Sequence, residues 1–334
     1  MAKGARIVTK RGLTLVVLGR ATESKERAWR EGLGLVRTVR LTGAAPSGSR
    51  FGSRALGLGL DSALVALKAL AVGARSPFLA TNPWIAVALK ATLRRRVAVT
   101  GIYAVAGSRS FKMLRLVLRD SPVVTTVRVE AEAWTAAGGR AVPVVYGNTF
   151  GYPESRDRGD DVLHIFVGGS SDRDTDAIDQ LEREIRSNSA PIALTVVGNE
   201  DPSSWSEGNR RIEHTGRVSP DRFGNLLSKA DVVFLPLVPS DRAAGHMVTV
   251  GALESGLRVL TSDTIGMTGY VDGRYVRPLK PGEPLLAQLE ALADRTDEGR
   301  AEARDFWRET FSVDAYVARV RGALRALSAP KQDA

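Results

Sequence analysis

The chain has 334 residues, of which 43% are hydrophobic and 25% are charged, a globular composition that excludes a disordered chain. It contains no cysteine, which excludes disulfides and thiolate metal sites, and residues 1–12 lack the apolar core of a signal peptide. The length favours two domains, because a single hydrophobic core stops growing at roughly 250–300 residues. We therefore expect a two-domain protein of the cytoplasm.

The net charge of +10 is distributed unevenly along the chain. Residues 1–150 hold 24 Lys and Arg against 7 Asp and Glu, which makes +17, whereas the remainder holds 23 against 30, or −7. A half this basic attracts an anionic membrane surface, a polyanionic glycan or nucleic acid. A solvated basic surface without any partner explains the same charge.

In the first half, short apolar runs predict buried strands over residues 13–18, 97–100, 123–127 and 141–145, and a helix over residues 62–72. The most apolar stretch, residues 55–72, contains Asp61 and Lys68. A membrane-spanning helix needs about 20 mostly apolar residues. We therefore interpret this stretch as a buried or interfacial helix.

Residues 109–119 have a helical period with two different sides. The basic side holds Arg109, Lys112, Arg115 and Arg119, and Leu114, Val117 and Leu118 cluster on another side. Such a helix lies on an anionic membrane surface or packs its apolar side on the core, and the sequence leaves both interpretations open. We recognise no nucleic-acid-binding motif in the sequence, and aromatic residues do not alternate with basic ones. We therefore expect no specific nucleic-acid partner.

Residues 147–161 are rich in Gly, Pro and charge and predict a linker. Beyond it, strands are expected over 162–167, 192–197, 231–235 and 258–261, helices over 174–186, 221–229 and 248–255, and a helical tail over 284–327 with breaks near Asp297 and Ser312. Short apolar strands that alternate with helices predict parallel sheets with covered faces. The expected fold class is α/β, with two Rossmann-like domains that face a cleft.

Loops that follow the strands of the second half are the candidate ligand contacts, because open parallel sheets bind ligands beyond the carboxyl ends of their strands. In the first loop, Gly169 lets backbone N–H groups approach an anion, and Arg173 can contact a phosphate with two N–H groups. A later loop holds Arg217, which either borders a bound base or belongs to a loop that packs on the next helix. These loops alone do not decide between ligand binding and ordinary turns.

The loop over residues 236–245 carries the strongest signal. Gly245 precedes a helix whose first N–H groups and positive dipole end suit a diphosphate. The residues at this helix start are His246, Met247, Val248 and Thr249. Two turns further on, Glu254 either accepts hydrogen bonds from two hydroxyls of a ribose or is a solvated helix residue. The spacing alone does not decide between these two interpretations.

The run over residues 212–273 resembles the donor-binding half of GT-B-fold glycosyltransferases, in particular the retaining family 4, also called glycosyl transferases group 1. The family pattern is G-x-V, then L-x-x-A-D-V, then a proline, then E-x-x-x-x-x-x-x-E-A-x-x-x-G-x-P-V. The matching residues here are Gly216-Arg217-Val218, then Leu226 to Val232 with Ala230-Asp231, then Pro236, then Leu253 to Val259 with Glu254 and Gly256. The likeness covers about half of the chain and extends weakly to Gly168 and Phe311.

The resemblance implies a role for several of these residues. Glu254 would bind the ribose, and His246 stands where the family has a glutamate that contacts the donor sugar. Of the family's usual Arg and Lys after the first strand of this domain, Gly169 takes the first place and Arg173 lies near the second, so one cation is missing. His246 would compensate, either protonated or as a neutral donor. The resemblance implies neither a catalytic side chain nor a metal, since the helix dipole and cations stabilise the leaving diphosphate.

The implied activity is that of a metal-independent retaining glycosyltransferase without a cofactor. It would move a sugar from a UDP- or GDP-sugar to a glycan, lipid-linked or small-molecule acceptor in polysaccharide biosynthesis, in the cytoplasm or at the inner face of the membrane. The acceptor domain would be residues 1–150, the nucleotide-sugar domain 151–312, and a tail helix, 313–334, would pack back on the first domain. The alternative is a catalytically degenerate GT-B protein that binds a glycan or a partner.

Overall fold

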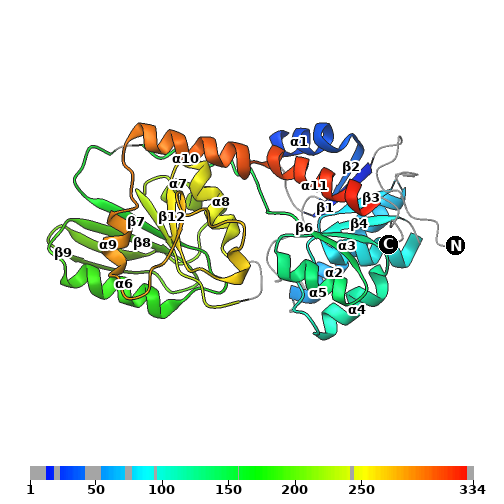
Figure 1. Cartoon of the computed structure of the whole chain (residues 1–334), viewed down its shortest axis with the longest axis horizontal. Helices are drawn as coiled ribbons and strands as arrows, with labels where there is room; N and C mark the ends of the chain where they lie inside the picture. The colour runs from blue at the N-terminus through cyan, green and yellow to red at the C-terminus, as the bar shows by residue number, and fades with distance from the viewer. Residues whose placement is uncertain are drawn as a thin grey trace. The chain divides into compact units, whose positions relative to one another are not determined.

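The computed structural model describes residues 13–18, 23–41, 54–71, 77–93, 96–156, 158–240 and 244–328. The chain divides into two compact units, each built on its own sheet (Figure 1). Unit 1 comprises Met1–Val145 and Tyr316–Ala334, and unit 2 comprises Tyr146–Ala315. The predicted α/β class with two parallel-sheet units is confirmed.

Unit 1 has a six-stranded sheet in the order β2-β1-β3-β4-β5-β6, and each pair of neighbouring strands is parallel. The strands are β1 (Leu13–Leu18), β2 (Leu35–Leu41), β3 (Phe78–Ala80), β4 (Val97–Thr100), β5 (Pro122–Thr125) and β6 (Arg140–Pro143). The strand order reverses direction after β2, so α1 covers one face of the sheet and α2 to α5 cover the other (Figure 1).

The helices of unit 1 are α1 (Glu23–Leu33), α2 (Arg54–Ala71), α3 (Pro83–Leu93), α4 (Arg109–Leu118), α5 (Arg128–Ala136) and α11 (Val313–Ser328). From Tyr316 onward α11 belongs to unit 1, where Tyr316 meets Trp29 of α1 with ring centroids 5.8 Å apart. On the opposite face, Phe111 of α4 packs edge-on against the fully buried Trp134 of α5. Both faces of the sheet are thus covered by helices.

The apolar side of α4 faces the core of unit 1. Phe111, Leu114 and Leu118 are buried and belong to the core cluster, whereas Leu116 is 70% exposed. Of the two interpretations that the sequence left open, the structure shows the one in which the apolar side packs on the core. No helix in the described ranges is both long enough and apolar enough to cross a bilayer.

Unit 2 has a seven-stranded sheet in the order β13-β12-β11-β7-β8-β10-β9, in which β9 alone runs antiparallel to its neighbour. The strands are β7 (Leu163–Gly168), β8 (Ile192–Val197), β9 (Ser203–Glu207), β10 (Arg210–His214), β11 (Val232–Leu235), β12 (Arg258–Thr261) and β13 (Val276–Pro278). The helices are α6 (Thr175–Ser187), α7 (Pro220–Leu227), α8 (His246–Glu254), η2 (Ile265–Met267), α9 (Leu285–Glu290) and α10 (Asp297–Thr310). Figure 1 shows α6 and α9 on one face of this sheet, and α7, α8 and α10 on the other.

The predicted linker is irregular, as expected, but it is fixed to unit 2. The N–H of Asn148 donates to the carbonyl of Phe311, and the N–H of Ser155 donates to the carbonyl of Ser255, both at 2.8 Å. The Ser155 hydroxyl is buried and donates to Ala230 at 2.9 Å. Residues that separate the two sheets along the chain are therefore part of the packing of unit 2.

Candidate functional site

Five strands of unit 2 end at one edge of the sheet and bring their following loops together, because β12, β11, β7, β8 and β10 run parallel. Contacts join these loops across the sheet: Gly169 N–H to the Val197 carbonyl at 3.0 Å, Val238 N–H to the Asp172 carbonyl at 3.1 Å, Leu237 N–H to the Ser262 hydroxyl at 2.9 Å, and Arg217 Nε to Asn199 Oδ1 at 2.7 Å. The predicted residues from Gly169 to His246 thus gather at the carboxyl edge of one sheet. Asp241, Arg242 and Ala243 lie outside the described residues.

The start of α8 presents backbone donors at this edge. Gly245 is the N-cap residue with φ of 82°, a left-handed conformation that favours glycine, and a Cβ there would lie 3.0 Å from Leu235. The N–H of Thr249 bonds to the Gly245 carbonyl at 3.0 Å, which leaves the N–H groups of residues 246–248 without an acceptor inside the helix. Three N–H groups at one helix start form a ready anion site.

The side chains at the start of α8 contribute little to this edge. Val248 and Thr249 are buried, and the Thr249 hydroxyl turns back to the Gly245 carbonyl at 3.3 Å. Met247 is 59% exposed and carries no polar group. Among the predicted residues of this turn, the backbone therefore supplies the polar contacts.

Arg173 lies against the loop after β7. Its Nε donates to the Gly168 carbonyl at 2.9 Å and its Nη1 to the Ser171 carbonyl at 2.7 Å. The guanidinium lies over Gly169, where a Cβ would collide with it. Burial lowers the pKa of Arg173 to about 10, although the neighbouring Asp172 opposes the shift. The group is therefore still cationic at neutral pH and is held in place at the site edge.

His246 differs from the prediction of a cation for a diphosphate. Its imidazole is 8% exposed and stacks on Tyr270, with ring centroids 5.1 Å apart and planes at 17°. Burial lowers the pKa of His246 to about 4, so the ring is neutral at pH 7. Its buried Nδ1 has no hydrogen-bond partner among the described residues. The missing cation is therefore not replaced by a protonated imidazole, and a role of the neutral ring as a donor stays a prediction.

Glu254 also differs from the prediction. Its two carboxylate oxygens accept the N–H groups of Phe150 and Gly151, each at 2.8 Å, and the residue is 7% exposed. It ends α8, eight residues from His246, which places it about 12 Å along the axis from the diphosphate donors. The predicted ribose role is thus corrected: this carboxylate holds the linker, and it is neither a solvated helix residue nor turned to the site edge.

The spacing of the family pattern explains the misplaced glutamate. In that pattern the ribose glutamate stands five residues before the glycine, whereas Glu254 stands two before Gly256. The fifth residue before Gly256 is Gly251, and a Cβ there would lie 2.8 Å from the Tyr152 ring. Tyr152 packs against this bare stretch of α8, so the chain has an aromatic contact where the pattern has a carboxylate.

Sequence reasoning missed a carboxyl group at the corresponding edge of unit 1. Glu130 lies in the first turn of α5, just beyond the carboxyl end of β5, and burial raises its pKa to about 7. Its Oε2 is buried without a hydrogen-bond partner among the described residues. Tyr103 is 58% exposed as a whole, but its hydroxyl end lies over Gly101, and the pKa of Tyr103 is raised to about 12 by desolvation of that end and then by Glu130. No sequence pattern singled out this residue, because a lone Glu on a helix is normally solvated.

The other two histidines, His164 and His214, pair with carboxylates. His214 pairs with Glu182 at 2.7 Å and with Glu200 at 2.9 Å, and His164 lies 3.3 Å from Asp160. In the part of the chain that the structure describes, no group of three His, Cys, Asp or Glu side chains is placed to hold a metal ion.

Comparisons with known proteins agree with this geometry. A family model described as "Glycosyl transferases group 1" matches residues 141–296, which contain all the loops at the carboxyl edge of unit 2. A search of curated protein sequences finds no match.

Solved structures are similar over nearly the whole chain. Sucrose-phosphate synthase from Thermosynechococcus elongatus is 15% identical with a TM-score of 0.60, and the match covers 94% of this chain and 98% of that one. A glycosyltransferase from Rickettsia africae is 13% identical with a TM-score of 0.61 over 94% and 98%. Anabaena HepE in complex with UDP-glucose is 13% identical with a TM-score of 0.59 over 93% and 98%. These likenesses show the fold, which is GT-B.

Proposed function

We propose that this chain, whose residues 141–296 belong to the group 1 glycosyl transferases, transfers a sugar from a nucleotide sugar to an acceptor hydroxyl with retention of configuration. The observation that carries the proposal is the convergence of five loops at the carboxyl edge of the unit 2 sheet, where α8 offers unpaired N–H groups and Arg173 a fixed cation. Anabaena HepE, which has the same fold, is recorded with UDP-glucose.

The diphosphate of the donor would lie at the start of α8, on the N–H groups of residues 246–248. Arg173 would face it from the loop after β7, which the Asp172 and Leu237 contacts hold beside the loop after β11. The nucleoside would extend toward the loops after β8 and β10, where Arg217 and Asn199 are paired. A UDP- or GDP-sugar has this arrangement of base, ribose and diphosphate.

The reaction would need no protein nucleophile. The bond between the anomeric carbon and the diphosphate oxygen breaks, and the acceptor oxygen bonds to the same face of that carbon. The proton of the acceptor hydroxyl passes to the leaving diphosphate, whose charge the α8 N–H groups and Arg173 stabilise. We therefore propose a metal-independent transfer, in which Arg173 and the N–H groups at the start of α8 stabilise the leaving diphosphate instead of a metal ion.

The acceptor, a glycan, a lipid-linked sugar or a small molecule, would bind unit 1. The carboxyl ends of β4 and β5 lead to Tyr103 and Glu130, which lie at the edge of the unit 1 sheet that corresponds to the donor edge of unit 2. The predicted location at a membrane is not part of this proposal, because the apolar side of α4 is buried.

A degenerate GT-B protein that binds a glycan or partner without turnover is the second candidate. It is favoured by one departure in α8: counted back from Gly256, Gly251 stands where the family pattern has the ribose glutamate. Release of free nucleotide from a donor supports the transferase, whereas tight glycan binding without release or transfer from any nucleotide sugar supports the degenerate protein.

A panel of UDP-, GDP- and TDP-sugars, read as shifts of the unfolding temperature, tests the donor site. We expect at least one donor to stabilise the protein, by about 2.7 kcal/mol at a hundredfold excess over Kd. Arg173→Ala should weaken the binding of inorganic diphosphate more than the binding of the nucleoside, because Arg173 would face the phosphates.

The matched control is Arg183→Ala, which removes an equal charge from the exposed side of α6 and should leave binding unchanged. A panel in which no nucleotide or diphosphate stabilises the protein at millimolar concentration would contradict the proposal. Equal losses in the two variants would contradict the role of Arg173.

A further inference from the structure

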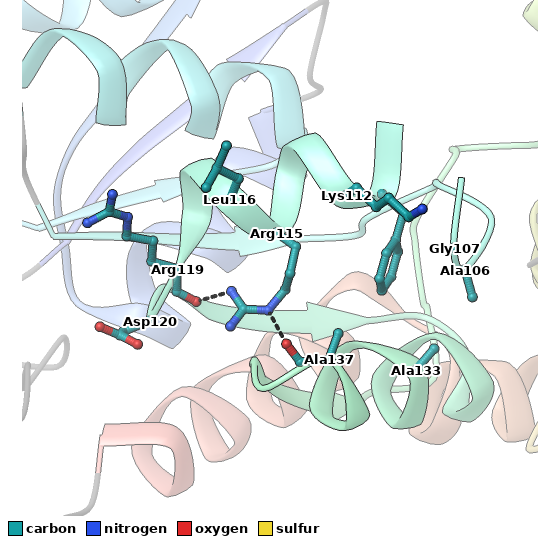
Figure 2. A pocket seen from close by; sticks show the side chains of 10 residues that line it. Ala106, Gly107, Lys112, Arg115, Leu116, Arg119, Asp120, Ala133 and Ala137 are labelled. Carbon is teal, nitrogen blue, oxygen red and sulfur yellow. Dashed lines mark hydrogen bonds between the residues drawn. The ribbon is translucent and has the colours of Figure 1, made fainter. Parts of the chain in front are cut away.

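The hollow beside α4 on unit 1 is spanned by one of its own side chains. The Arg115 guanidinium lies between α4 and α5 and donates to the carbonyls of Ala137 at 3.0 Å and Arg119 at 2.7 Å (Figure 2). These carbonyls belong to the residues that end the two helices, so Arg115 caps both helices from within the hollow. A cavity on unit 2 differs, because two of its cations have no such partners.

This second cavity, of about 340 Å³, lies on the face of the unit 2 sheet that α7 covers. Phe166 of β7 marks this face, because its ring packs edge-on against Phe223 of α7 with centroids 5.2 Å apart. Thr195 of β8 and Glu213 of β10 stand in register with Phe166 across the sheet, and such residues point to the same face. We call the space that these residues line the α7–β10 cavity, and its lining also includes Arg158, His164, Arg211, Leu226 and Lys229.

The cavity is open because the connection from β8 to β10 contains no helix. Residues 198–209 form β9 and two turns, and β9 pairs with β10 at the end of the sheet. A connection between two parallel strands usually contains a helix that covers the sheet. Without such a helix, Arg211 and Glu213 of β10 are exposed beside α7.

Two cations of the α7–β10 cavity are available to an anion. Arg211 lies on the β10 side, and Lys229, two residues beyond the end of α7, lies on the α7 side. Both are exposed, and neither forms an ion pair within the part of the chain that the structure describes. Arg158 is already paired, with Asp160 at 3.4 Å. A phosphate monoester, which carries up to two negative charges, complements the two remaining cations.

The floor of the cavity offers hydrogen-bonding groups beside these cations. Thr195 is the one polar residue of β8, although inner strands of a parallel sheet normally consist of apolar residues. Its hydroxyl has no hydrogen-bond partner among the residues that the structure describes. A threonine hydroxyl both donates and accepts, and the Glu213 carboxylate accepts from hydroxyls. The complementary ligand therefore carries hydroxyl groups as well as a phosphate.

We propose that the α7–β10 cavity binds a small sugar phosphate. The phosphate lies between Arg211 and Lys229, and the sugar hydroxyls contact Thr195 and Glu213. The volume is at the lower end of the range of about 300–1,000 Å³ for small-molecule pockets, which suits a phosphorylated monosaccharide.

The α7–β10 cavity is separate from the donor site. Arg211 is the second residue of β10, and Lys229 precedes β11, so the cavity lies toward the amino ends of the strands. The start of α8 lies at their carboxyl edge. Binding in the cavity therefore does not depend on the proposed transfer.

The test is calorimetric titration of the full chain with ribose 5-phosphate, compared with inorganic phosphate and with ribose. We expect saturable binding of ribose 5-phosphate that is about tenfold tighter than that of either comparison compound. Arg211→Gln and Lys229→Gln should each weaken it about tenfold. Glu213→Gln should weaken the binding of ribose 5-phosphate but not that of inorganic phosphate, because the carboxylate contacts the hydroxyls. All three variants change exposed side chains and should keep the fold.

Two control variants lie outside the cavity. Arg222→Gln removes one charge from an exposed position of α7, and Arg173→Ala removes the cation of the donor edge; both should bind ribose 5-phosphate like the wild type. The proposal is overturned if ribose 5-phosphate does not bind, if inorganic phosphate or ribose binds equally well, or if either control loses as much affinity as Arg211→Gln. Loss in Arg173→Ala alone would place the sugar phosphate at the donor edge instead.

Discussion

At the scale of single residues, His246 differs from the other two histidines, because no carboxylate among the described residues lies beside it. His164 and His214 each lie within 3.3 Å of an acidic side chain, whereas His246 lies between Tyr270 and Tyr146. An imidazole in an aromatic stack has no counter-ion for its charged form, and desolvation therefore lowers its pKa to about 4. The residue contributes to the site by packing the start of α8.

Stability should depend on pH through this residue. The folded pKa of about 4 lies below the ordinary value of 6.5, so the unfolded chain binds the proton more readily, and the stabilisation present above pH 6.5 is lost as the pH falls toward 4. Each pH unit costs at most about 1.4 kcal/mol, which makes about 2–3 kcal/mol by pH 4.5. Urea unfolding of the wild type and of His246→Phe at pH 7 and 4.5 measures the difference.

His246→Phe should lose less stability between these two pH values, because phenylalanine keeps the stacked ring and has no proton to bind. If the variant and the wild type lose the same free energy of unfolding between pH 7 and pH 4.5, the buried neutral imidazole is not the cause of the acid sensitivity.

Residue roles were the part of the site that the sequence predicted least well. The loops were located correctly, because glycines after apolar strands mark the carboxyl edge of a parallel sheet. Which way a side chain turns depends on distant partners, such as Phe150 for Glu254 and Tyr270 for His246, and no local pattern reports them. For Glu254, the spacing to Gly256 was a signal in the sequence that pointed away from the ribose role.

At the scale of elements, α8 joins the site edge to the linker. Its first turn would supply the donors for a diphosphate, and its last residue, Glu254, accepts hydrogen bonds from the N–H groups of Phe150 and Gly151. Gly251 between them leaves room for Tyr152. The linker is therefore anchored on the same helix that would bind the donor.

Glu254→Gln tests this division of α8. An amide has one acceptor oxygen and would turn its NH₂ toward the second N–H, so we expect a loss of about 2–3 kcal/mol in the free energy of unfolding. Binding of UDP should change by less than about twofold, because the start of α8 keeps its N–H groups. Urea unfolding and a UDP titration measure the two effects, and unchanged stability with loss of UDP binding would restore the ribose role to Glu254.

The elements predicted best are those with continuous apolar runs. The strands over 13–18, 97–100, 192–197 and 258–261 have the predicted bounds, since each is buried in its sheet. The prediction did not find α1, in which Ala28 and Leu33 are buried and Trp29 packs on α11, nearly three hundred residues later. It also did not find β9, whose one large apolar side chain, Trp205, packs against the core of unit 2 and has the guanidinium groups of Arg186 and Arg210 over its ring.

At the scale of the whole molecule, each of the two units has its own sheet and core, and we propose that unit 2 binds the donor and unit 1 the acceptor. Unit 2 has a carboxyl edge lined by backbone donors, a fixed arginine and small residues, which suits an anionic donor. Unit 1 includes most of the basic segment 1–150, which contains 24 Lys and Arg but only 7 Asp and Glu. Its helix α4 packs its apolar side on the core, and Arg109, Lys112 and Arg119 are exposed on the other side.

A crystal structure of the protein with UDP or GDP at saturating concentration tests the central claim most directly. We predict density for the diphosphate within hydrogen-bonding distance, about 3 Å, of the N–H groups of residues 246–248, with Arg173 facing the phosphates. Nucleotide density at any other place on the chain, with the start of α8 in contact with water alone, would contradict the account.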